Sequence, residues 1–358
     1  MRFSHESLPQ TVHFGSGEAQ PNIAFALEEL GARRVMLIAS ASSRDVAHRI
    51  TAGLSIAAFH DEVVRHVPLD VAERARAVAA EHEVDALVSV GGGSATGLAK
   101  AIALTSEVPI VAVPTTYAGS ETTSVWGMTD AGPKTTGTDW RVLPRTIVYD
   151  AALTLTLPVE TSVASALNAL AHCVDSLWAP HADPINRALA LDAVRALNRG
   201  LPELVAAPGA LAGREQVLYA SYLAGVAFAS AGAGLHHQIC HVLGGRFNLP
   251  HAETHAVVLP YVLAFNGPAL PDEEGMLASA FGADTALEGL ERLRAAVAAP
   301  RALRDHGLDE GDLVDAANAL MSAVPAGNPR PVTRETLLSL LRAAWEGADP
   351  RQYGSWER

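Results

Sequence analysis

Short apolar runs alternate with amphipathic stretches over the first half of the chain. Runs such as Arg34–Ala39 and Asp85–Val90 are typical of strands that are buried on both faces. Between them, hydrophobic positions recur with the period of a helix. We therefore predict a parallel sheet that is covered by helices on both sides. The expected strands are 11–14, 34–39, 63–67, 85–90, 109–113 and 146–149, and the expected helices are 21–30, 43–54, 71–83 and 95–105.

From Asp150 onward only the helical period remains. Prolines separate the helical segments, as expected where helices end. The predicted helices are 161–179, 183–199, 213–231, 235–243, 251–265, 284–298, 308–323 and 333–344. A chain of 358 residues is too long for one compact core. We predict an α/β dinucleotide-binding domain over residues 1–153 and an all-α catalytic domain over residues 154–358.

Two polar loops follow predicted strands. Gly91–Ser94 lies between a strand and a helix, where backbone amides and the helix N-terminus can bind phosphate. The usual dinucleotide and P-loop fingerprints are absent, and a glycine-rich turn alone is often only structural. The loop 114–122 adds hydroxyl groups for phosphates and ribose, so we predict nucleotide binding. The candidate residues are Gly91, Gly92, Gly93, Ser94, Thr115, Thr116, Ser120, Thr122 and Lys134, one of only two lysines.

Histidines gather in the second half. Five of the fourteen histidines lie within Gly234–His255. His237 and His241 are four residues apart, so a helix presents both on one face. Gly244-Gly245 is expected to end that helix, and the next one begins at His251. We predict that these imidazoles converge on one cavity; separate core or surface histidines are the alternative.

An earlier predicted helix carries a related pair. Asn168 and His172 also stand four residues apart. A His or carboxylate pair at this spacing is a common half-site for a metal ion. Asn168 is a poorer metal ligand than an aspartate because its amide carries no charge.

Composition limits the possible partners. The net charge is −13 and no stretch is dense in Lys or Arg, which argues against nucleic acid as a partner. Cys173 and Cys240 are the only cysteines, and both lie in apolar helical patterns, so a disulfide framework is not expected. We find neither a signal-peptide pattern nor a membrane-spanning run. A cytoplasmic protein with a small-molecule substrate is the expectation.

Together these motifs resemble the iron-containing alcohol dehydrogenase family over nearly the whole chain. The shared features are the Gly-Gly-Gly-Ser loop, the Pro-Thr-Thr…Gly-Ser-Glu loop, the two helical pairs, and a Pro-His that places His251 fourteen residues after His237. The resemblance implies a dinucleotide-binding N-terminal domain and a helical C-terminal domain with the family's metal ligands. It also implies a nicotinamide-dependent oxidoreductase, for which we expect a homodimer.

Three positions depart from the family pattern. Asn168 stands where the family's metal site has Asp, so Asn168, His172, His237 and His251 offer no formal charge to a divalent cation. We therefore expect no bound metal. Gly97 replaces the Asp of the family's Gly-Gly-Gly-Ser-x-x-Asp. Ser40 lacks the carboxylate that would repel a 2′-phosphate, so either NADH or NADPH is the expected cofactor.

With these departures, the chain is similar to those family members that reduce a carbon–carbon double bond conjugated to a ketone in a dicarboxylate from aromatic-compound breakdown. Hydride addition β to the ketone produces an enolate, which the site must stabilise and protonate. Imidazoles can do both near neutral pH, and a conjugated alkene is already electrophilic. We assign His172, His237 and His251 to the substrate oxygen, His241 to proton donation, and Tyr117 and Arg246 to the substrate carboxylates.

Three other functions stay open. The first is a metal-dependent alcohol or polyol dehydrogenase of the same family, with Asn168 as a neutral ligand. The second is a lyase of the 3-dehydroquinate synthase kind, which recycles its NAD. The third is a catalytically silent nucleotide-binding protein, against which the histidine cluster argues.

Overall fold

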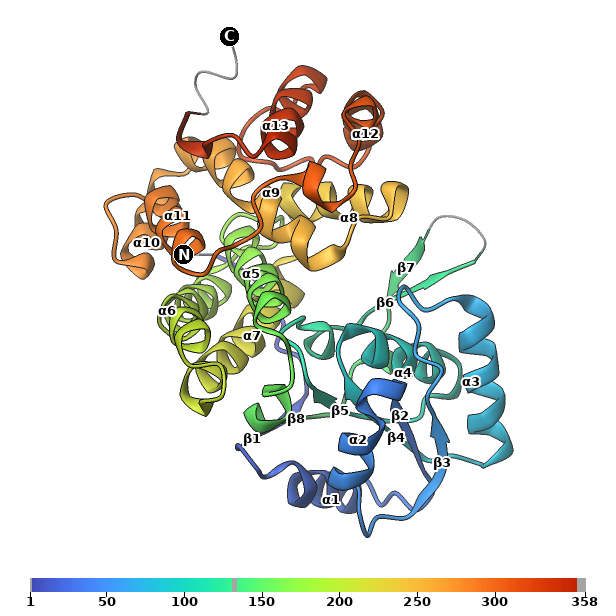
Figure 1. Cartoon of the computed structure of the whole chain (residues 1–358). Helices are drawn as coiled ribbons and strands as arrows, with labels where there is room; N and C mark the ends of the chain where they lie inside the picture. The colour runs from blue at the N-terminus through green and yellow to red at the C-terminus, as the bar shows by residue number, and fades with distance from the viewer. Residues whose placement is uncertain (1, 131–133, 353–358) are drawn as a thin grey trace. The chain divides into compact units, whose positions relative to one another are not determined.

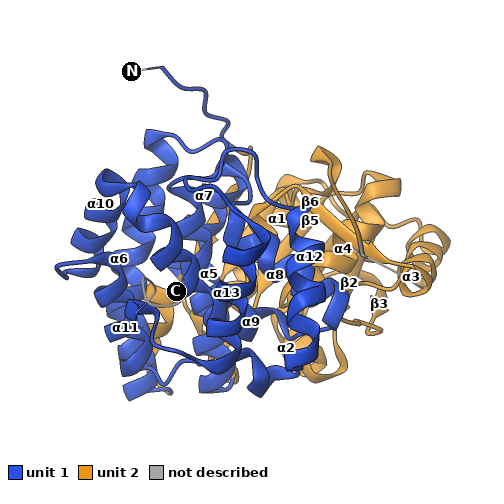
Figure 2. Cartoon of the chain, turned by 90° about the horizontal axis from the view of Figure 1, so that it is seen from above, with its two compact units in different colours: residues 1–7, 158–208, 219–358 blue, residues 8–157, 209–218 orange. Residues whose placement is uncertain are grey.

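The computed structural model describes residues 2–130 and 134–352, and the chain forms two compact units (Figure 2). The sheet unit comprises residues 8–157 and 209–218. The helical unit comprises residues 1–7, 158–208 and 219–358. The boundary predicted after residue 153 falls within the short 3-10 helix η4 (Ala151–Thr154), near the end of the sheet unit.

A six-stranded sheet lies at the centre of the sheet unit (Figure 1). Its strand order is β1-β8-β5-β4-β2-β3, and every pairing is parallel. The strands are β1 (Thr11–Phe14), β2 (Val35–Ala39), β3 (Ile56–His60), β4 (Ala86–Gly91), β5 (Ile110–Pro114) and β8 (Thr146–Tyr149). The predicted parallel sheet is therefore confirmed.

Helices cover both faces because successive side chains of a strand point to opposite sides. Met36 and Ile38 pack with α3 (Leu69–Glu81) and α4 (Gly93–Ser106). Leu37 packs on the other face with α1 (Ala19–Glu29) and α2 (Arg44–Ile50). All three side chains are fully buried. Each contributes about 1.5–3 kcal/mol to folding by leaving water.

The strand predicted at residues 63–67 is wrong. The third strand is β3, which ends at His60. His66 and Val67 both have left-handed backbone, with φ of 63° and 48°, so this segment cannot extend as a strand. Instead it turns toward a hairpin formed by β6 (Val125–Thr129) and β7 (Lys134–Thr138), where Thr129 N donates to the carbonyl oxygen of Val67 at 3.1 Å.

The described part of the helical unit contains no named strand (Figure 1). Its helices are α5 (Val159–Ser176), α6 (Pro184–Ala206), most of α7 (Leu211–Ala231), α8 (Leu235–Phe247), α9 (His251–Asn266), α10 (Pro271–Phe281), α11 (Ala286–Ala296), α12 (Leu313–Met321) and α13 (Arg334–Glu346). The predicted all-helical second half is confirmed, although α10 was not predicted. Leucines and valines of α8, α9, α12 and α13 share one core.

Gly244-Gly245 does not end α8, contrary to prediction. The helix continues to Phe247 and ends at Asn248, which has a left-handed φ of 55°. Glycine weakens a helix by only about 1 kcal/mol, and the packing of Leu243 in the core keeps the helix intact. Asparagine tolerates the left-handed conformation that terminates helices.

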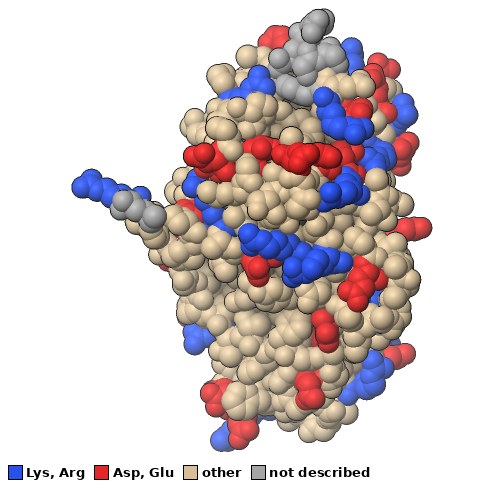
Figure 3. All heavy atoms as spheres, turned by 90° about the vertical axis from the view of Figure 1, so that its left-hand side faces the viewer, with Lys and Arg blue, Asp and Glu red and all other residues tan. Residues whose placement is uncertain are grey.

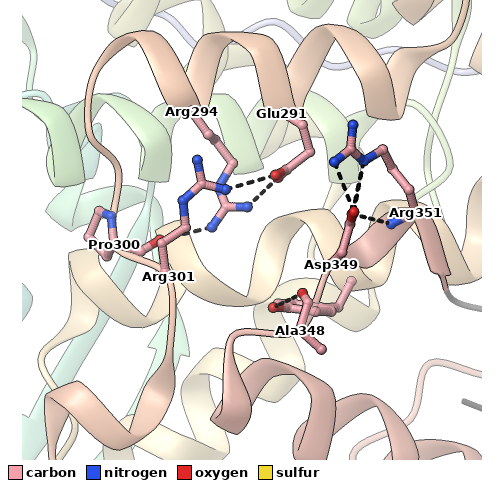
Figure 4. A network of polar contacts seen from close by, with 8 residues as sticks. Glu291, Arg294, Pro300, Arg301, Ala348, Asp349 and Arg351 are labelled. Carbon is pink, nitrogen blue, oxygen red and sulfur yellow. Dashed lines mark hydrogen bonds and ion pairs between the residues drawn. The ribbon is translucent and has the colours of Figure 1, made fainter.

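Two separate groups of charged contacts lie near the end of the described chain (Figure 4). Glu291 accepts from Arg294, which is fully buried, and from Arg301 at 2.8 Å. Asp349 pairs with Arg351, and Tyr261 donates to the carbonyl oxygen of Ala348, both at 2.8 Å. All of these contacts lie within the helical unit, and the bond from Tyr261 fixes the segment after α13 to α9.

The distribution of surface charge and the hydropathy of the helices can be compared with the predictions made from composition. Figure 3 shows acidic and basic side chains intermingled over one face. Within the described residues, no single helix is long and apolar enough to cross a membrane. Taken together, α7 and α8 are long and apolar enough by length and composition alone, but the two helices are bent by 98° relative to each other.

Candidate active site

Ser40 and Gly91–Ser94 lie at the carboxyl ends of neighbouring strands. Ser40 follows β2, and Gly91 ends β4. From β2 the chain continues to β3 on one side, and from β4 it continues to β5 on the other, so the winding of the sheet reverses between β2 and β4. Ligands of open α/β sheets bind outside the carboxyl ends of the strands at such a reversal. The structure thus brings these predicted cofactor residues together where a dinucleotide is expected.

The glycines of this loop occupy positions without room for a side chain. Gly91 has a φ of 150°, and a Cβ there would lie 2.9 Å from the Cβ of Ala95. A Cβ at Gly92 would lie 2.9 Å from Cγ2 of Thr116. Gly92 is also the N-cap of α4, which has no side-chain cap. The first amides of α4, together with the helix dipole, can therefore bind an anion such as pyrophosphate.

The second predicted loop lies beside the first. Thr115 N donates to the carbonyl oxygen of Gly91 at 3.0 Å, and Thr116 packs against Gly92. Ser120 is half-buried, whereas Thr122 is buried and donates to the carbonyl oxygen of Gly119 at 2.8 Å. The structure therefore uses the hydroxyl proton of Thr122 to stabilise the loop. Lys134 begins β7, and its side chain lies outside the described residues.

Sequence reasoning missed Lys100, the ammonium that ties the second loop to α4. Its Nζ donates to the carbonyl oxygens of Ser120 and Thr123, each at 2.7 Å, and of Val125 at 2.8 Å. Lys100 is fully buried, and this burial lowers its pKa to about 7, while nearby Glu121 acts in the opposite direction. The scarcity of lysine and its position in an apolar helix were the available signals.

The structure does not support Tyr117 as a ligand for a substrate carboxylate. Its side chain is buried in the sheet unit, where the hydroxyl donates to Oγ1 of Thr154 at 3.1 Å. Arg214 donates to the same hydroxyl at 3.4 Å and to the carbonyl oxygen of Thr154. Burial raises the pKa of Tyr117. This tyrosine therefore anchors its loop from inside.

Several predicted site residues of the helical unit do lie together. Asn168 and His172 come from α5, His237 and His241 from α8, and His251 from the start of α9. The rings of His172 and His237 stack with centroids 5.0 Å apart, and those of His241 and His251 stack at 6.4 Å. The ring centroids of His237 and His241 are 6.1 Å apart.

Burial divides these residues into two groups. Asn168, His172 and His237 are buried, whereas His241 and His251 are exposed. Burial lowers the pKa of His172 to about 4, with nearby His241 acting in the same direction, and it lowers the pKa of His237 well below its usual value. These two imidazoles are therefore neutral at pH 7 and can donate or accept only through uncharged rings.

Asp175 is a site residue that sequence reasoning missed. Its Oδ2 accepts from Nδ1 of His237 at 2.6 Å and from the backbone amides of His237 and Gly234, each at 3.1 Å. The carboxyl group is fully buried, which raises its pKa to about 7 although the amides act against this. The contact leaves Nε2 of His237 as the nitrogen without a hydrogen-bond partner. Asp175 thus orients this imidazole and selects its tautomer.

Arg246 does not join the histidines. Its guanidinium forms a bidentate ion pair with Asp315, in which Nε donates to Oδ2 at 2.6 Å and Nη2 donates to Oδ1 at 2.8 Å. About half of each side chain is exposed. The structure therefore gives no support to Arg246 as the ligand for a substrate carboxylate, because its donors already bind a carboxylate of α12.

Behind these residues lies a second buried group. Nε2 of His236 is 2.9 Å from Nδ1 of His255 and 3.6 Å from Sγ of Cys240. All three side chains are essentially inaccessible to solvent. The ring of His255 also lies 4.3 Å from that of His251 and 4.8 Å from that of His237. Polar side chains therefore continue inward from the exposed histidines into the helical core.

Comparison with known families gives matches along most of the chain. Residues 9–151 match the family profile described as iron-containing alcohol dehydrogenase. Residues 162–345 match the profile described as Fe-containing alcohol dehydrogenase family, C-terminal.

Individual proteins are similar over almost the full length. The maleylacetate reductase of Pseudomonas sp. (strain P51) is 43% identical over 353 residues, which cover 98% of this chain and 100% of that protein. The crystal structure of an iron-containing alcohol dehydrogenase from Corynebacterium glutamicum is 58% identical, with a TM-score of 0.96 and 98% of each chain covered. That of maleylacetate reductase from Agrobacterium tumefaciens is 37% identical, with a TM-score of 0.93 and coverage of 98% and 100%.

Proposed function

The chain belongs to the iron-containing alcohol dehydrogenase family, and from this premise we propose that it uses NADH or NADPH to reduce the carbon–carbon double bond of maleylacetate, giving 3-oxoadipate in the breakdown of aromatic compounds. The observation that carries the proposal is the likeness to maleylacetate reductases over nearly the whole chain. The buried neutral imidazoles agree with it, because the reaction needs hydrogen-bond donors and a proton at an enolate.

The expectation that no metal is bound is wrong. Membership of the family implies an iron or other metal ion in addition to the nicotinamide cofactor. The residues that the sequence indicated fit such an ion, because Oδ1 of Asn168, Nδ1 of His172 and Nε2 of His237 are buried and have no hydrogen-bond partner. Together with His251 they would hold it, and a bound cation would polarise the ketone oxygen of the substrate.

The sheet unit provides what a dinucleotide requires. The N-terminus of α4 and the amides of Gly91–Ser94 would hold the pyrophosphate, and Thr115 and Thr116 would bind beside it. Ser40 lies at the end of β2, where a ribose hydroxyl or a 2′-phosphate is expected. A serine repels neither group, so both cofactors are compatible with this position.

The helical unit provides the proton chemistry. Hydride adds to the carbon β to the ketone, and negative charge develops on the ketone oxygen. The ring N–H group of His172 can stabilise that oxygen without carrying charge itself. His237 donates its own N–H to Asp175, so its Nε2 presents a lone pair instead. His241 and His251 are exposed and can exchange protons with water, so either is suited to protonate the carbon next to the ketone.

The test is oxidation of NADH by the purified protein with maleylacetate, compared with a panel of aldehydes, ketones and polyols. We expect maleylacetate to give the highest kcat/KM by at least about 100-fold, which corresponds to about 2.7 kcal/mol. A higher kcat/KM for an aldehyde or a simple ketone would instead favour an alcohol dehydrogenase. We further propose a cytoplasmic homodimer, for which light scattering of the eluted protein gives the mass.

A further inference from the structure

Asp175 places a buried carboxyl group behind one of the residues that would hold the metal ion. Its side chain has no exposure to solvent, and Oδ2 lies 2.6 Å from Nδ1 of His237. The same oxygen accepts from the backbone amides of Gly234 and His237, each at 3.1 Å. Three N–H groups thus converge on Oδ2, whereas Oδ1 is buried and has no hydrogen-bond partner. Because an ionised carboxyl group only accepts hydrogen bonds, this arrangement suits a carboxylate.

The surrounding protein does not balance the charge of this carboxylate. Among the described residues, no Lys or Arg forms an ion pair with Asp175, and its contact is with the ring of His237. That ring is uncharged, as are the rings of His172 and His236 that lie against it. A buried charge is costly unless an opposite charge pairs with it. A divalent cation at Nε2 of His237 would provide that charge.

We propose that Asp175 supplies, through His237, the negative charge that the metal site lacks at Asn168. The inference rests on the proposed function, in which the ion is held by Asn168, His172, His237 and His251. Asp175 binds Nδ1 of His237, so Nε2 is the nitrogen that is available to the ion. A carboxylate that accepts from the far nitrogen of a metal-bound histidine fixes the ring and makes it a stronger ligand. Asp175 is therefore a positioning residue that acts through His237.

Charge balance explains how a site with Asn168 can hold a divalent cation. The four ligands carry no formal charge, so alone they would leave both charges of the ion uncompensated in a buried place. The carboxylate of Asp175 offsets one of them from a distance of one imidazole ring. The anionic group has thus moved from the layer that binds the ion to the layer behind it.

The position of this carboxylate depends on Gly234. A Cβ at Gly234 would lie 2.6 Å from Oδ1 of Asp175, so a side chain there would displace the carboxylate. Gly234 is also the N-cap of α8 and provides no side-chain cap. Asp175 performs that task from α5, because it accepts from the first amides of α8. A test must therefore separate helix capping from an effect on the metal ion.

Asp183 provides the matched control. It is buried and accepts from the backbone amides of Ile185 and Asn186 at the start of α6, at 2.7 Å and 2.9 Å. It also lies 2.8 Å from Nδ1 of His5. This carboxylate combines the same two contacts, a helix N-terminus and an imidazole, but none of these partners is a predicted metal ligand. Loss of capping alone should lower Tm at either aspartate.

The test is calorimetric titration of the full-length protein with Co²⁺ after removal of metal by chelation. Asp175→Asn keeps the shape of the side chain and removes its charge, so it should raise the Kd for Co²⁺ by about 10–100-fold. Asp183→Asn should leave the Kd unchanged. Adding Asn168→Asp to Asp175→Asn should recover most of the lost affinity, because a negative charge returns to the site. Circular dichroism and Tm on the same samples show whether each variant is folded.

Three results would overturn the proposal: a wild-type protein that does not bind Co²⁺, an unchanged Kd in Asp175→Asn, or a double variant that binds no better than Asp175→Asn. Gly234→Ala is the second variant if Asp175→Asn does not fold. It keeps every charge but displaces the carboxylate from His237, so it should also weaken Co²⁺ binding, and an unchanged Kd would contradict the proposal. The titration contains neither NADH nor maleylacetate, so its outcome is separate from that of the proposed reduction.

Discussion

The hydrogen bond between Asp175 and His237 determines which ring nitrogen of the histidine is available. Nδ1 is held by a buried carboxyl group at 2.6 Å, so Nε2 is left for a ligand. His172 stacks on the same ring, and Phe228 packs against both. At the scale of single residues, the orientation of the His237 ring is therefore fixed by its hydrogen bond to Asp175 and by its packing against His172 and Phe228.

The first prediction concerns these rings. His237→Ala, His241→Ala and His251→Ala should each lower kcat with maleylacetate by about 100-fold or more, because each removes a ring nitrogen that contacts the reacting groups or supplies the proton. The KM for NADH should change little. Steady-state kinetics and Tm are measured on the same samples, with His306→Ala as the control. A fall in Tm with normal kcat in all three variants would show that these histidines only stabilise the fold.

The second prediction concerns the cofactor loop. Gly92→Val should raise the KM for NADH at least about tenfold, or about 1.4 kcal/mol, because its Cβ would lie 2.9 Å from Cγ2 of Thr116. Gly275→Ala is the control, since no atom lies within 4 Å of its added Cβ. An unchanged KM at Gly92 would mean that this loop does not approach the dinucleotide.

The sequence predicted some residues of the candidate site correctly and missed or misassigned others. The spacing of His237 and His241 was sufficient to place both on α8, because helical geometry is local. Asp175 was missed because its partner lies 62 residues away, a separation that no local pattern encodes. Tyr117 was misassigned for a related reason: Arg214, 97 residues later, binds its hydroxyl inside the sheet unit.

At the scale of elements, Lys100 joins α4 to the segment between β5 and β6. The third prediction is that Lys100→Met lowers Tm and raises the KM for NADH. Three carbonyl oxygens would lose their donor, at about 1–3 kcal/mol for each buried group left unsatisfied. Lys100→Arg should recover part of the loss. Equal Tm and KM in the wild type and Lys100→Met would contradict the anchoring role.

Gly97 explains one departure from the family pattern in physical terms. A Cβ at this position of α4 would lie 3.0 Å from Cγ2 of Val67, whose left-handed backbone places it there. The fourth prediction is that Gly97→Ala destabilises the protein by about 1–3 kcal/mol, although alanine normally favours a helix. Val67→Ala in the same chain should relieve part of this loss, as a double-mutant cycle in denaturant would show. Additive effects would contradict the contact.

The elements differ in how far sequence predicts them. The apolar runs that became β2, β4 and β5 were predicted because buried parallel strands consist almost wholly of hydrophobic residues. Residues 63–67 also include three valines. Val67, however, packs against Gly97 and accepts a hydrogen bond from Thr129 of the β6–β7 hairpin, and these contacts hold the segment in a turn. The continuation of α8 through Gly244-Gly245 likewise depends on packing that only the folded chain provides.

At the scale of the whole molecule, we assign dinucleotide binding to the sheet unit and proton chemistry to the helical unit. The division follows from the sequence, because glycines and hydroxyls follow the strands while the histidines cluster on α8 and α9. The acidic net charge of −13 does not favour an anionic substrate, so local donors must bind its carboxylates. Neither Tyr117 nor Arg246 is placed to do this.

We propose that the nicotinamide cofactor delivers its hydride to a carbon of a conjugated double bond. The most direct measurement uses NADH deuterated at the transferred position, with maleylacetate as substrate in ordinary water, and locates the label in the product by NMR. We predict 3-oxoadipate with deuterium on the carbon β to the ketone and with the adjacent proton taken from solvent. Deuterium on a newly formed carbinol carbon would show that the enzyme reduces the ketone, and would contradict the proposed reduction of the double bond.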